Sequence, residues 1–269
     1  MIRGVYHIEF YKVNDKIPTI FIKHDKFATK KLPAVILMHG LSSSKERNLA
    51  FGMLLANEGF LVAMPDAHMH GDRSTEPLHK LLRDKPLETF FDILSTTVDD
   101  IISIIDYLEE REDVQKEMIG MTGISMGGIL TFMAGLADER IKVMAPIIAS
   151  GDYLTAIKKS TLIDELGIKR EVIEKIEIPP EMKPIVEELD PAYNAKKLYP
   201  RPLIMVTGGK DTIIPKEAVE NTVNAIRDAY KEKPHLFKHS EYPNVGHNVT
   251  EEMLEEVITF LKNFLSAKE

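Results

Sequence analysis

Two kinds of apolar pattern alternate along most of this 269-residue chain, and the alternation restricts its possible folds more than any other feature. Short runs of consecutive apolar residues are separated by longer stretches in which apolar residues recur every third or fourth position. Strands that are apolar throughout are buried on both faces, and intervening helices typically cover both faces of a parallel sheet. The sequence therefore predicts an α/β fold with a mostly parallel central sheet. The expected strands are residues 34–38, 61–64, 118–122, 143–149 and 203–207.

The two ends of the chain carry other signals. Residues 5–11 and 19–23 alternate between apolar and polar side chains and flank an Asn-Asp pair that favours a tight turn. We therefore expect an antiparallel hairpin ahead of the first parallel strand. Near the other end, Asn248 with Glu251 three residues later predicts the start of a last helix.

Residues 151–197 interrupt the alternation. They carry many charges and several prolines but no convincing strand, so short helices are expected. We expect a small helical insertion into one α/β core made of residues 1–150 and 198–269. The insertion is predicted either to form a lid over a pocket or to pack on the core without touching substrate. Its apolar residues at helical spacing are Leu154, Ile157, Leu162, Ile163 and Leu166.

Composition excludes several classes of function. The 42 acidic residues outnumber the 34 Lys and Arg, giving a net charge of −8, which is unfavourable for binding nucleic acid. The absence of cysteine excludes disulfides, thiolate metal sites and a cysteine nucleophile. The N-terminus lacks the apolar segment of a signal peptide, and no apolar run approaches the roughly 18 residues of a membrane helix. We expect a cytoplasmic protein with a small-molecule partner and neither nucleic-acid nor membrane partners. Its oligomeric state, a homodimer included, stays open.

One glycine-rich pentapeptide predicts a catalytic serine. Gly123-Ile124-Ser125-Met126-Gly127 follows a predicted strand and precedes a helical stretch. A nucleophile on a tight strand-to-helix turn needs small neighbours two positions away on each side, because the turn cannot otherwise close. Such a turn exposes the serine hydroxyl close to a helix N-terminus, whose N–H groups favour negative charge. An ordinary glycine-rich turn has the same residues, but the strand–turn–helix context favours the catalytic interpretation.

A serine hydroxyl needs a base, and His247 and Asp211 are the candidate base and acid. Each follows a strand-like run, so each is expected at the same edge of the sheet as Ser125. The order serine, aspartate, histidine along the chain is that of the α/β-hydrolases. Asp152, which follows the run 143–149, is the alternative acid, although it could instead cap the first helix of the insertion.

The loop after the first parallel strand is the candidate oxyanion-binding element. It consists of His39-Gly40-Leu41 and the residues that follow. Backbone N–H groups of such a loop, together with the N–H after the nucleophile, stabilise the oxyanion of an acyl-transfer intermediate. We therefore expect Leu41 and Met126 to be the donors. His39 is expected to orient the loop, because the serine needs only one base.

Together these motifs resemble the α/β-hydrolase superfamily, and more narrowly small bacterial esterases related to dienelactone hydrolases and to the catalytic domains of prolyl oligopeptidases. The resemblance implies a serine hydrolase that needs no metal or organic cofactor. Two features differ: dienelactone hydrolases proper use a cysteine, and oligopeptidases carry a large N-terminal domain where only about 30 residues precede this core. The matching segments are His39-Gly40, residues 65–74, residues 123–128, Gly209-Lys210-Asp211 and Gly246-His247.

The predicted activity is that of a carboxylesterase. Small to medium carboxylic esters would be cleaved by a Ser125–His247–Asp211 triad through an acyl-enzyme intermediate. Peptidase, thioesterase and acyltransferase reactions use the same triad and stay alternatives, because a fold does not determine its substrate.

Two alternatives come from other classes of protein. His68, His70 and Asp72 form a His-x-His-x-Asp cluster that resembles the first zinc ligands of metallo-β-lactamase-fold hydrolases. Arg73 then stands where that family has a further histidine. The other alternative is a non-catalytic binding module on the same fold, which would be expected to have a degraded triad.

Overall fold

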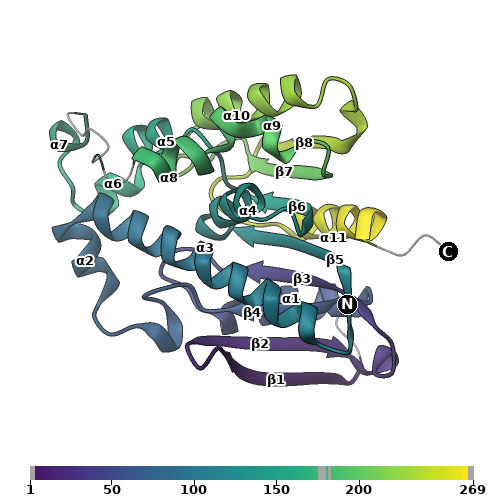
Figure 1. Ribbon diagram of the computed structural model, residues 1–269. Coiled ribbons are helices and arrows are strands. Elements are labelled where there is room, and N and C mark those ends of the chain that lie inside the picture. The colour runs from purple at the N-terminus through teal and green to yellow at the C-terminus, as the bar shows by residue number, and fades with distance from the viewer. Residues whose placement is uncertain (1–3, 175–179, 181–182, 266–269) are drawn as a thin grey trace.

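The computed structural model of the protein describes residues 4–174, 180 and 183–265, and its strands form an eight-stranded sheet (Figure 1). The strands are β1 (Tyr6–Val13), β2 (Ile17–His24), β3 (Leu32–Met38), β4 (Leu61–Pro65), β5 (Val114–Ile124), β6 (Ile141–Ile147), β7 (Leu203–Gly208) and β8 (Phe237–Tyr242). Their order across the sheet is β1-β2-β4-β3-β5-β6-β7-β8. β2 is antiparallel to both of its neighbours, and every later pair is parallel. The predicted, mostly parallel sheet is confirmed.

Helices cover both faces of this sheet, as predicted. Those of the core are α1 (Leu49–Asn57), α2 (Leu78–Asp84), α3 (Pro86–Glu110), α4 (Met126–Ala137), α10 (Lys216–Ala229) and α11 (Glu251–Leu265). Short 3-10 helices are η1 (Asp25–Phe27), η2 (Lys45–Asn48), η3 (Gly71–Arg73) and η4 (Pro234–Leu236). Apolar residues of α3, α4 and α10 pack on one face of the sheet, and those of α1 and α11 pack on the other.

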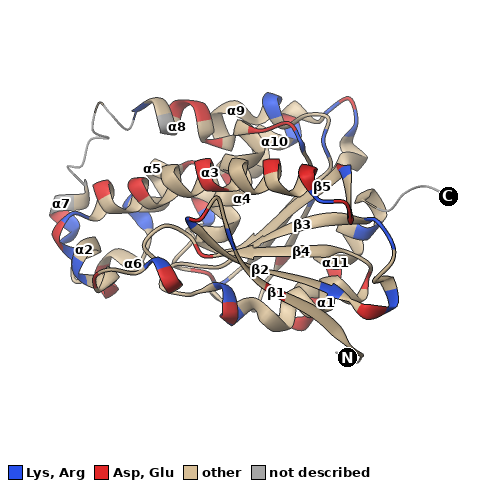
Figure 2. Ribbon diagram, turned by 60° about the horizontal axis from the view of Figure 1, so that its bottom comes forward, with Lys and Arg blue, Asp and Glu red and all other residues tan. Residues whose placement is uncertain are grey.

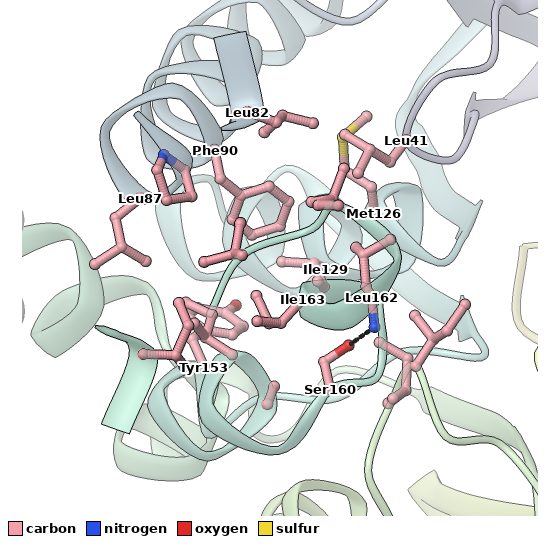
Figure 3. A pocket seen from close by; sticks show the side chains of 18 of the residues that line it. Leu41, Leu82, Leu87, Phe90, Met126, Ile129, Tyr153, Ser160, Leu162 and Ile163 are labelled. Atoms are coloured by element: carbon pink, nitrogen blue, oxygen red, sulfur yellow. Dashed lines mark hydrogen bonds between the residues drawn. The ribbon is translucent and has the colours of Figure 1, made fainter. Parts of the chain in front are cut away.

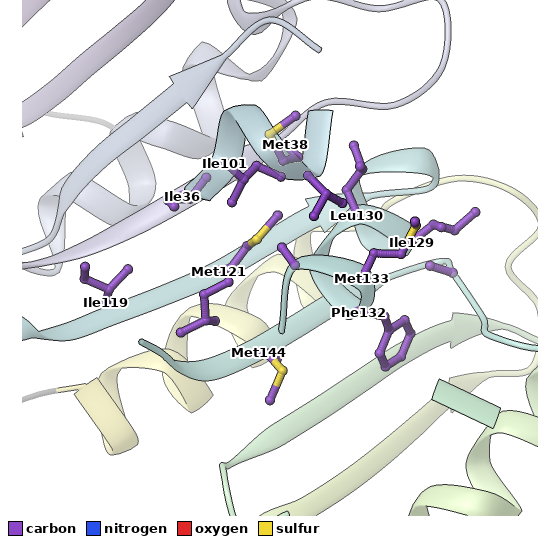
Figure 4. Packing of buried hydrophobic residues seen from close by; sticks show 14 of the residues in the cluster. Ile36, Met38, Ile101, Ile119, Met121, Ile129, Leu130, Phe132, Met133 and Met144 are labelled. Carbon is purple, nitrogen blue, oxygen red and sulfur yellow. The ribbon is translucent and has the colours of Figure 1, made fainter. Parts of the chain in front are cut away.

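The alternation of side chains along each strand explains why the parallel strands are apolar throughout. In β3, Ala34, Ile36 and Met38 belong to the cluster under α3 and α4, whereas Val35 and Leu37 belong to the opposite cluster. Figure 4 shows the first of these clusters, where methionine and isoleucine side chains fill the space between sheet and helices. Because both faces are covered, each position of such a strand has to be apolar.

The hairpin and the last helix test two local predictions. Residues 14–16 join β1 to β2, and within this turn Asn14 and Asp15 have left-handed backbones with φ of 51° and 58°. The predicted hairpin is therefore confirmed. The predicted start of α11 is wrong, because Thr250 Oγ1, and not the Asn248 side chain, accepts the Met253 N–H at 3.3 Å. Asn248 lies in the preceding loop.

The interruption at 151–197 consists of short helices where the structure describes it, which are α5 (Tyr153–Lys159), α6 (Leu162–Glu165), α7 (Arg170–Glu174), α8 (Lys183–Leu189) and α9 (Pro191–Leu198). Its two ends are joined by Asp190, which is buried. The Asp190 carboxylate accepts the N–H groups of Asp152 and Tyr153, each at 2.8 Å. Residues 175–179 and 181–182 of the insertion lie outside the described residues. The role of the segment as a lid stays a prediction.

Charged residues lie mainly on the outer faces of the helices and on loops, whereas β3 and β4 carry none (Figure 2). This distribution is expected for a sheet that helices cover on both faces. Among the described residues, no helix combines the length and the apolar character that crossing a bilayer requires.

Candidate active site

Ser125 occupies the sharp turn between β5 and α4. Its backbone has φ of 56° and ψ of −115°, a strained conformation for a residue with a side chain. The turn is held in place because the Ser125 N–H donates to Ile147 O of β6 at 2.9 Å, while Ser125 O accepts from Gly128 N–H at 2.8 Å. The serine therefore stands at the carboxyl edge of the sheet, at the start of a helix.

Close backbone contacts explain the two glycines around Ser125. A Cβ atom on Gly123 would lie 2.3 Å from Gly127 O, and one on Gly127 would lie 2.3 Å from Met38 O of β3. Neither contact can be relieved by moving a side chain, because the opposing atoms are backbone. The Gly-x-Ser-x-Gly spacing is thus a steric requirement of this turn.

His247 connects Ser125 to Asp211. Its Nε2 lies 2.8 Å from Ser125 Oγ, and its Nδ1 lies 2.7 Å from Asp211 Oδ2. A carboxylate only accepts hydrogen bonds, so Nδ1–H donates to Asp211 and Nε2 is free to accept the serine hydroxyl proton. The structure thus brings together the three residues that the sequence singled out, in the geometry of a nucleophile activated by an oriented base.

The loops after β7 and β8 are what place Asp211 and His247 side by side. The backbone N–H groups of Gly209 and Lys210 donate to Tyr242 O and Val245 O at 2.8 and 2.9 Å. A Cβ atom on Gly208 would lie 2.5 Å from Val245 O, so a glycine lets the two loops approach. The other carboxylate oxygen of Asp211 accepts two backbone N–H groups at 2.9 Å, which fixes its orientation.

Asp152, the alternative acid, has different partners. Its side chain accepts the Thr155 N–H at the start of α5 and the Asn221 amide at 2.6 Å. These are the contacts of a helix-capping residue, which the sequence offered as its second interpretation. The structure brings Asp211, and not Asp152, to His247.

The candidate oxyanion donors lie close to Ser125. Leu41 and Met126 both line the pocket to which Ser125 belongs. A Cβ atom on Gly40 would lie 3.7 Å from Ser125 Cβ, so the loop after β3 runs directly beside the serine. In the described part of the chain, neither the Leu41 nor the Met126 N–H has a hydrogen-bond acceptor, and both are available to a bound anion.

Two buried histidines hold this loop. His39 Nε2 accepts the Ala67 N–H at 3.0 Å and its other ring nitrogen donates to Gly40 O at 2.8 Å. His70 Nε2 accepts the Ser42 N–H at 3.1 Å and its other nitrogen donates to His68 O at 2.7 Å. Burial lowers the pKa of His39 to about 4 and also lowers the pKa of His70, so both rings are neutral near pH 7.

A buried ion pair also joins the segment after β3 to the loop after β4. Lys45 Nζ lies 2.6 Å from the fully buried carboxylate of Asp66 and 2.9 Å from that of Asp72. Burial alone would lower the pKa of Lys45, but its hydrogen bonds to Asp66, Asp72 and Glu46 raise that pKa above its ordinary value. Asp66 also accepts the backbone N–H groups of Lys45 and Asp72, so its charge is well satisfied.

These contacts weigh against the zinc alternative. Both ring nitrogens of His70 are bonded to backbone groups, and Asp72 is paired with Lys45. His68 points elsewhere, with its Nε2 3.6 Å from Asp92. No group of three metal-ligating side chains occurs among residues 4–174, 180 and 183–265. The His-x-His-x-Asp cluster supports the loop beside Ser125 instead.

An apolar pocket of about 100 Å³ opens beside Ser125 (Figure 3). Four of the five apolar residues singled out in the insertion line it, and Leu154 is the exception. The opposite wall comes from α2 and the start of α3, where Leu82, Leu87 and Phe90 face the pocket. This second wall was not predicted from the sequence. The sequence pattern that could have predicted it is the apolar face of α3, which continues from Leu94 toward the N-terminus of the helix.

The chain is similar in sequence to two bacterial proteins and similar in fold to a solved structure. The YitV protein of Bacillus subtilis is 29% identical over 250 residues, which cover 93% of this chain and 96% of YitV. Esterase YjfP of Escherichia coli is 26% identical over 237 residues, covering 87% of this chain and 90% of YjfP. The TT1662 structure from Thermus thermophilus has a TM-score of 0.78 at 20% identity, covering 98% of this chain and all of that one.

The family assignment comes from a match to a family profile. Residues 51–268 match the prolyl oligopeptidase family, and this stretch contains Ser125, Asp211 and His247. It begins within α1 and therefore includes the five strands from β4 to β8. The protein is thus an α/β-hydrolase that belongs to the prolyl oligopeptidase family.

Proposed function

We propose that this protein hydrolyses carboxylic esters through an acyl-enzyme on Ser125. The observation that carries the proposal is the continuous hydrogen-bonded chain from Ser125 Oγ through His247 to Asp211, with distances of 2.8 and 2.7 Å. Its acid is fixed by two backbone N–H groups, and its serine stands on a strained turn. Such a chain raises the nucleophilicity of a serine hydroxyl.

The reaction follows from the positions of these groups. Ser125 Oγ attacks the ester carbonyl carbon while its proton passes to His247 Nε2, and Asp211 stabilises the resulting imidazolium. The N–H groups of Leu41 and Met126 stabilise the oxyanion of the tetrahedral intermediate. The C–O bond to the alcohol then breaks, and the alcohol oxygen takes the proton from His247. Water next attacks the acyl-enzyme and gives its proton to the same nitrogen, which releases the acid and restores Ser125.

Hydrolysis is favoured over acyl transfer by the exposure of the base. The His247 side chain is 20% exposed while that of Asp211 is 3% exposed, so water reaches the base from the surface. The esterase name of YjfP also favours an ester substrate. Peptide bonds stay a second candidate, because an acylaminoacyl peptidase of Pyrococcus horikoshii shares the fold at a TM-score of 0.70 and 17% identity, over 43% of its own length.

The test is turnover of activated esters by the wild type and by Ser125→Ala. We expect the substitution to reduce kcat by about four to six orders of magnitude, because the triad acts as a unit. A chelator should leave the wild-type rate unchanged, and an organophosphonate should abolish it. Thermal unfolding checks that the variant is folded. Near-normal activity of a folded Ser125→Ala would contradict the proposal.

A further inference from the structure

The pocket beside Ser125 offers almost no polar group to a ligand. Nineteen described residues line it, and none of them is Asp, Glu, Lys, Arg or His. Only Ser125, Tyr153 and Ser160 contribute a side-chain oxygen. The Tyr153 hydroxyl donates to Leu189 O at 2.9 Å, and Ser160 Oγ accepts the Leu162 N–H at 3.1 Å. Ser160 keeps its O–H proton for donation, so the lining offers a ligand two serine hydroxyls, those of Ser125 and Ser160, and no charged group.

Such a lining discriminates by polarity. A charged group that entered the pocket would lose its hydration and find no partner of opposite charge, which is strongly unfavourable. An apolar chain gains affinity by about fourfold for each methylene group that leaves water. The lining therefore favours an uncharged hydrocarbon group.

The position of His247 decides which side of the ester enters the pocket. His247 is not among the described residues of the lining, and it reaches Ser125 Oγ from the partly exposed side. The departing alcohol takes its proton from His247 Nε2 and must therefore lie on that side. Leu41 and Met126 do belong to the lining, so the carbonyl carbon bonded to Ser125 is held at the mouth of the pocket. The acyl chain then extends inward.

We infer that this pocket is an acyl site that selects uncharged, apolar acyl groups longer than acetyl, whereas the alcohol part of the ester is little discriminated. The inference rests on the proposed ester hydrolysis at Ser125. The walls of the pocket are apolar faces of α2 and α3 on one side and of the insertion on the other (Figure 3). The insertion is thus assigned a role in specificity.

The wild-type substrate profile is the first measurement. We expect kcat/KM for the 4-nitrophenyl ester of octanoate to exceed that for acetate by at least about tenfold, and the singly charged succinate ester to be the poorest substrate. Ethyl and phenylethyl octanoate should be cleaved at similar rates, because their alcohols lie outside the pocket. Equal or faster cleavage of acetate, or ready cleavage of the succinate ester, would overturn the inference.

Two variants on α5 separate pocket shape from packing. Ala156 lines the pocket, so Ala156→Leu should fill part of it and lower the octanoate-to-acetate ratio of kcat/KM by about tenfold or more. Leu154 lies on the same helix but outside the lining, so Leu154→Ala is the matched control. We expect Leu154→Ala to lower the melting temperature and leave the ratio unchanged. If the octanoate-to-acetate ratio were the same in Ala156→Leu as in Leu154→Ala, the result would contradict an acyl site in this pocket.

A binding experiment keeps this inference separate from the catalytic proposal. The neutral ketone 2-decanone should raise the melting temperature of folded Ser125→Ala protein, whereas acetone at the same concentration should not, because a ligand of the folded state stabilises it. Adding Ala156→Leu should remove the effect. If ester turnover proves independent of Ser125 while this binding persists, the catalytic proposal fails and the apolar site stands. If turnover depends on Ser125 but the ketone does not bind, the acyl-site inference is contradicted and the catalytic proposal is not.

Discussion

Ser125 lies between two regions that are held together by different forces. On one side, the loop after β3 is fastened to the loop after β4 by directional bonds, namely those of His39 and His70 and the buried pair Lys45–Asp66. On the other side, the pocket wall consists of apolar side chains from α2, α3 and the insertion. Groups that act on a reacting atom need exact placement, which hydrogen bonds provide. A wall that receives a hydrocarbon needs shape alone.

This difference separates the expected effects of substitution. Changes among the hydrogen-bonded groups should alter the rate for every substrate by a similar factor, because they affect the reacting atoms. Changes in the apolar wall should alter the order of preference among substrates. The following predictions test that separation, from the largest effect to the smallest.

The largest expected contrast is between two aspartates. Asp211→Asn should lower kcat by about four orders of magnitude, because an amide no longer fixes the required tautomer of His247. Asp152→Asn should keep most activity, since Asp152 caps α5 and contacts Asn221. Steady-state kinetics of both variants decide between them. Loss of activity in Asp152→Asn, together with an active Asp211→Asn, would show that Asp152 and not Asp211 is the acid of the triad.

A smaller effect is expected at His70, a positioning residue for the loop that carries Leu41. His70→Leu removes the acceptor for the Ser42 N–H and should lower kcat by about tenfold to a hundredfold with little change in KM. The factor should be the same for acetate and octanoate esters. His70→Gln keeps an acceptor and should recover part of the loss.

The control for His70 lies on the same loop. His68 is half-buried and faces Asp92, so His68→Leu should leave kcat nearly unchanged. If His70→Leu changes KM or the order of preference among substrates instead of kcat, its bond to Ser42 does not position the oxyanion loop.

The smallest effect concerns stability rather than rate. His39 has a folded-state pKa of about 4, below the roughly 6.5 of an unfolded histidine, so the unfolded chain takes up the proton first. Its stabilising contribution is present above pH 6.5 and is lost as the pH falls toward 4, by about 3 kcal/mol in all. The free-energy difference between wild type and His39→Gln should therefore shrink over that range in urea unfolding. A difference that is constant with pH would show that His39 is not held neutral.

The sequence predicted best those parts of the site that depend on strand ends. Ser125, Asp211 and His247 each follow a recognisable strand, and parallel strands bring their carboxyl ends to one edge. The contact between His70 and Ser42 could not be predicted, because the partner is a backbone N–H, a group that almost every residue carries. Because such backbone partners cannot be recognised in a sequence, the spacing of His68, His70 and Asp72 resembled that of metal ligands.

The pocket wall was predictable only in part for a similar reason. Helical spacing showed which face of the insertion is apolar, but the same spacing is found in helices that only pack on a core. Leu154 illustrates this, because it shares the spacing and lies outside the pocket lining. The facing residues Leu87 and Phe90 come from a helix far away in sequence, and their meeting with Ile163 depends on tertiary packing.

The most direct test of the central claim is covalent labelling of the nucleophile. A fluorophosphonate should add one group to the wild type, and peptide mass spectrometry should locate it on Ser125. Ser125→Ala should stay unlabelled, and His247→Ala should label far more slowly because the serine has lost its base. Labelling at another residue, or labelling of folded Ser125→Ala at the wild-type rate, would contradict the account.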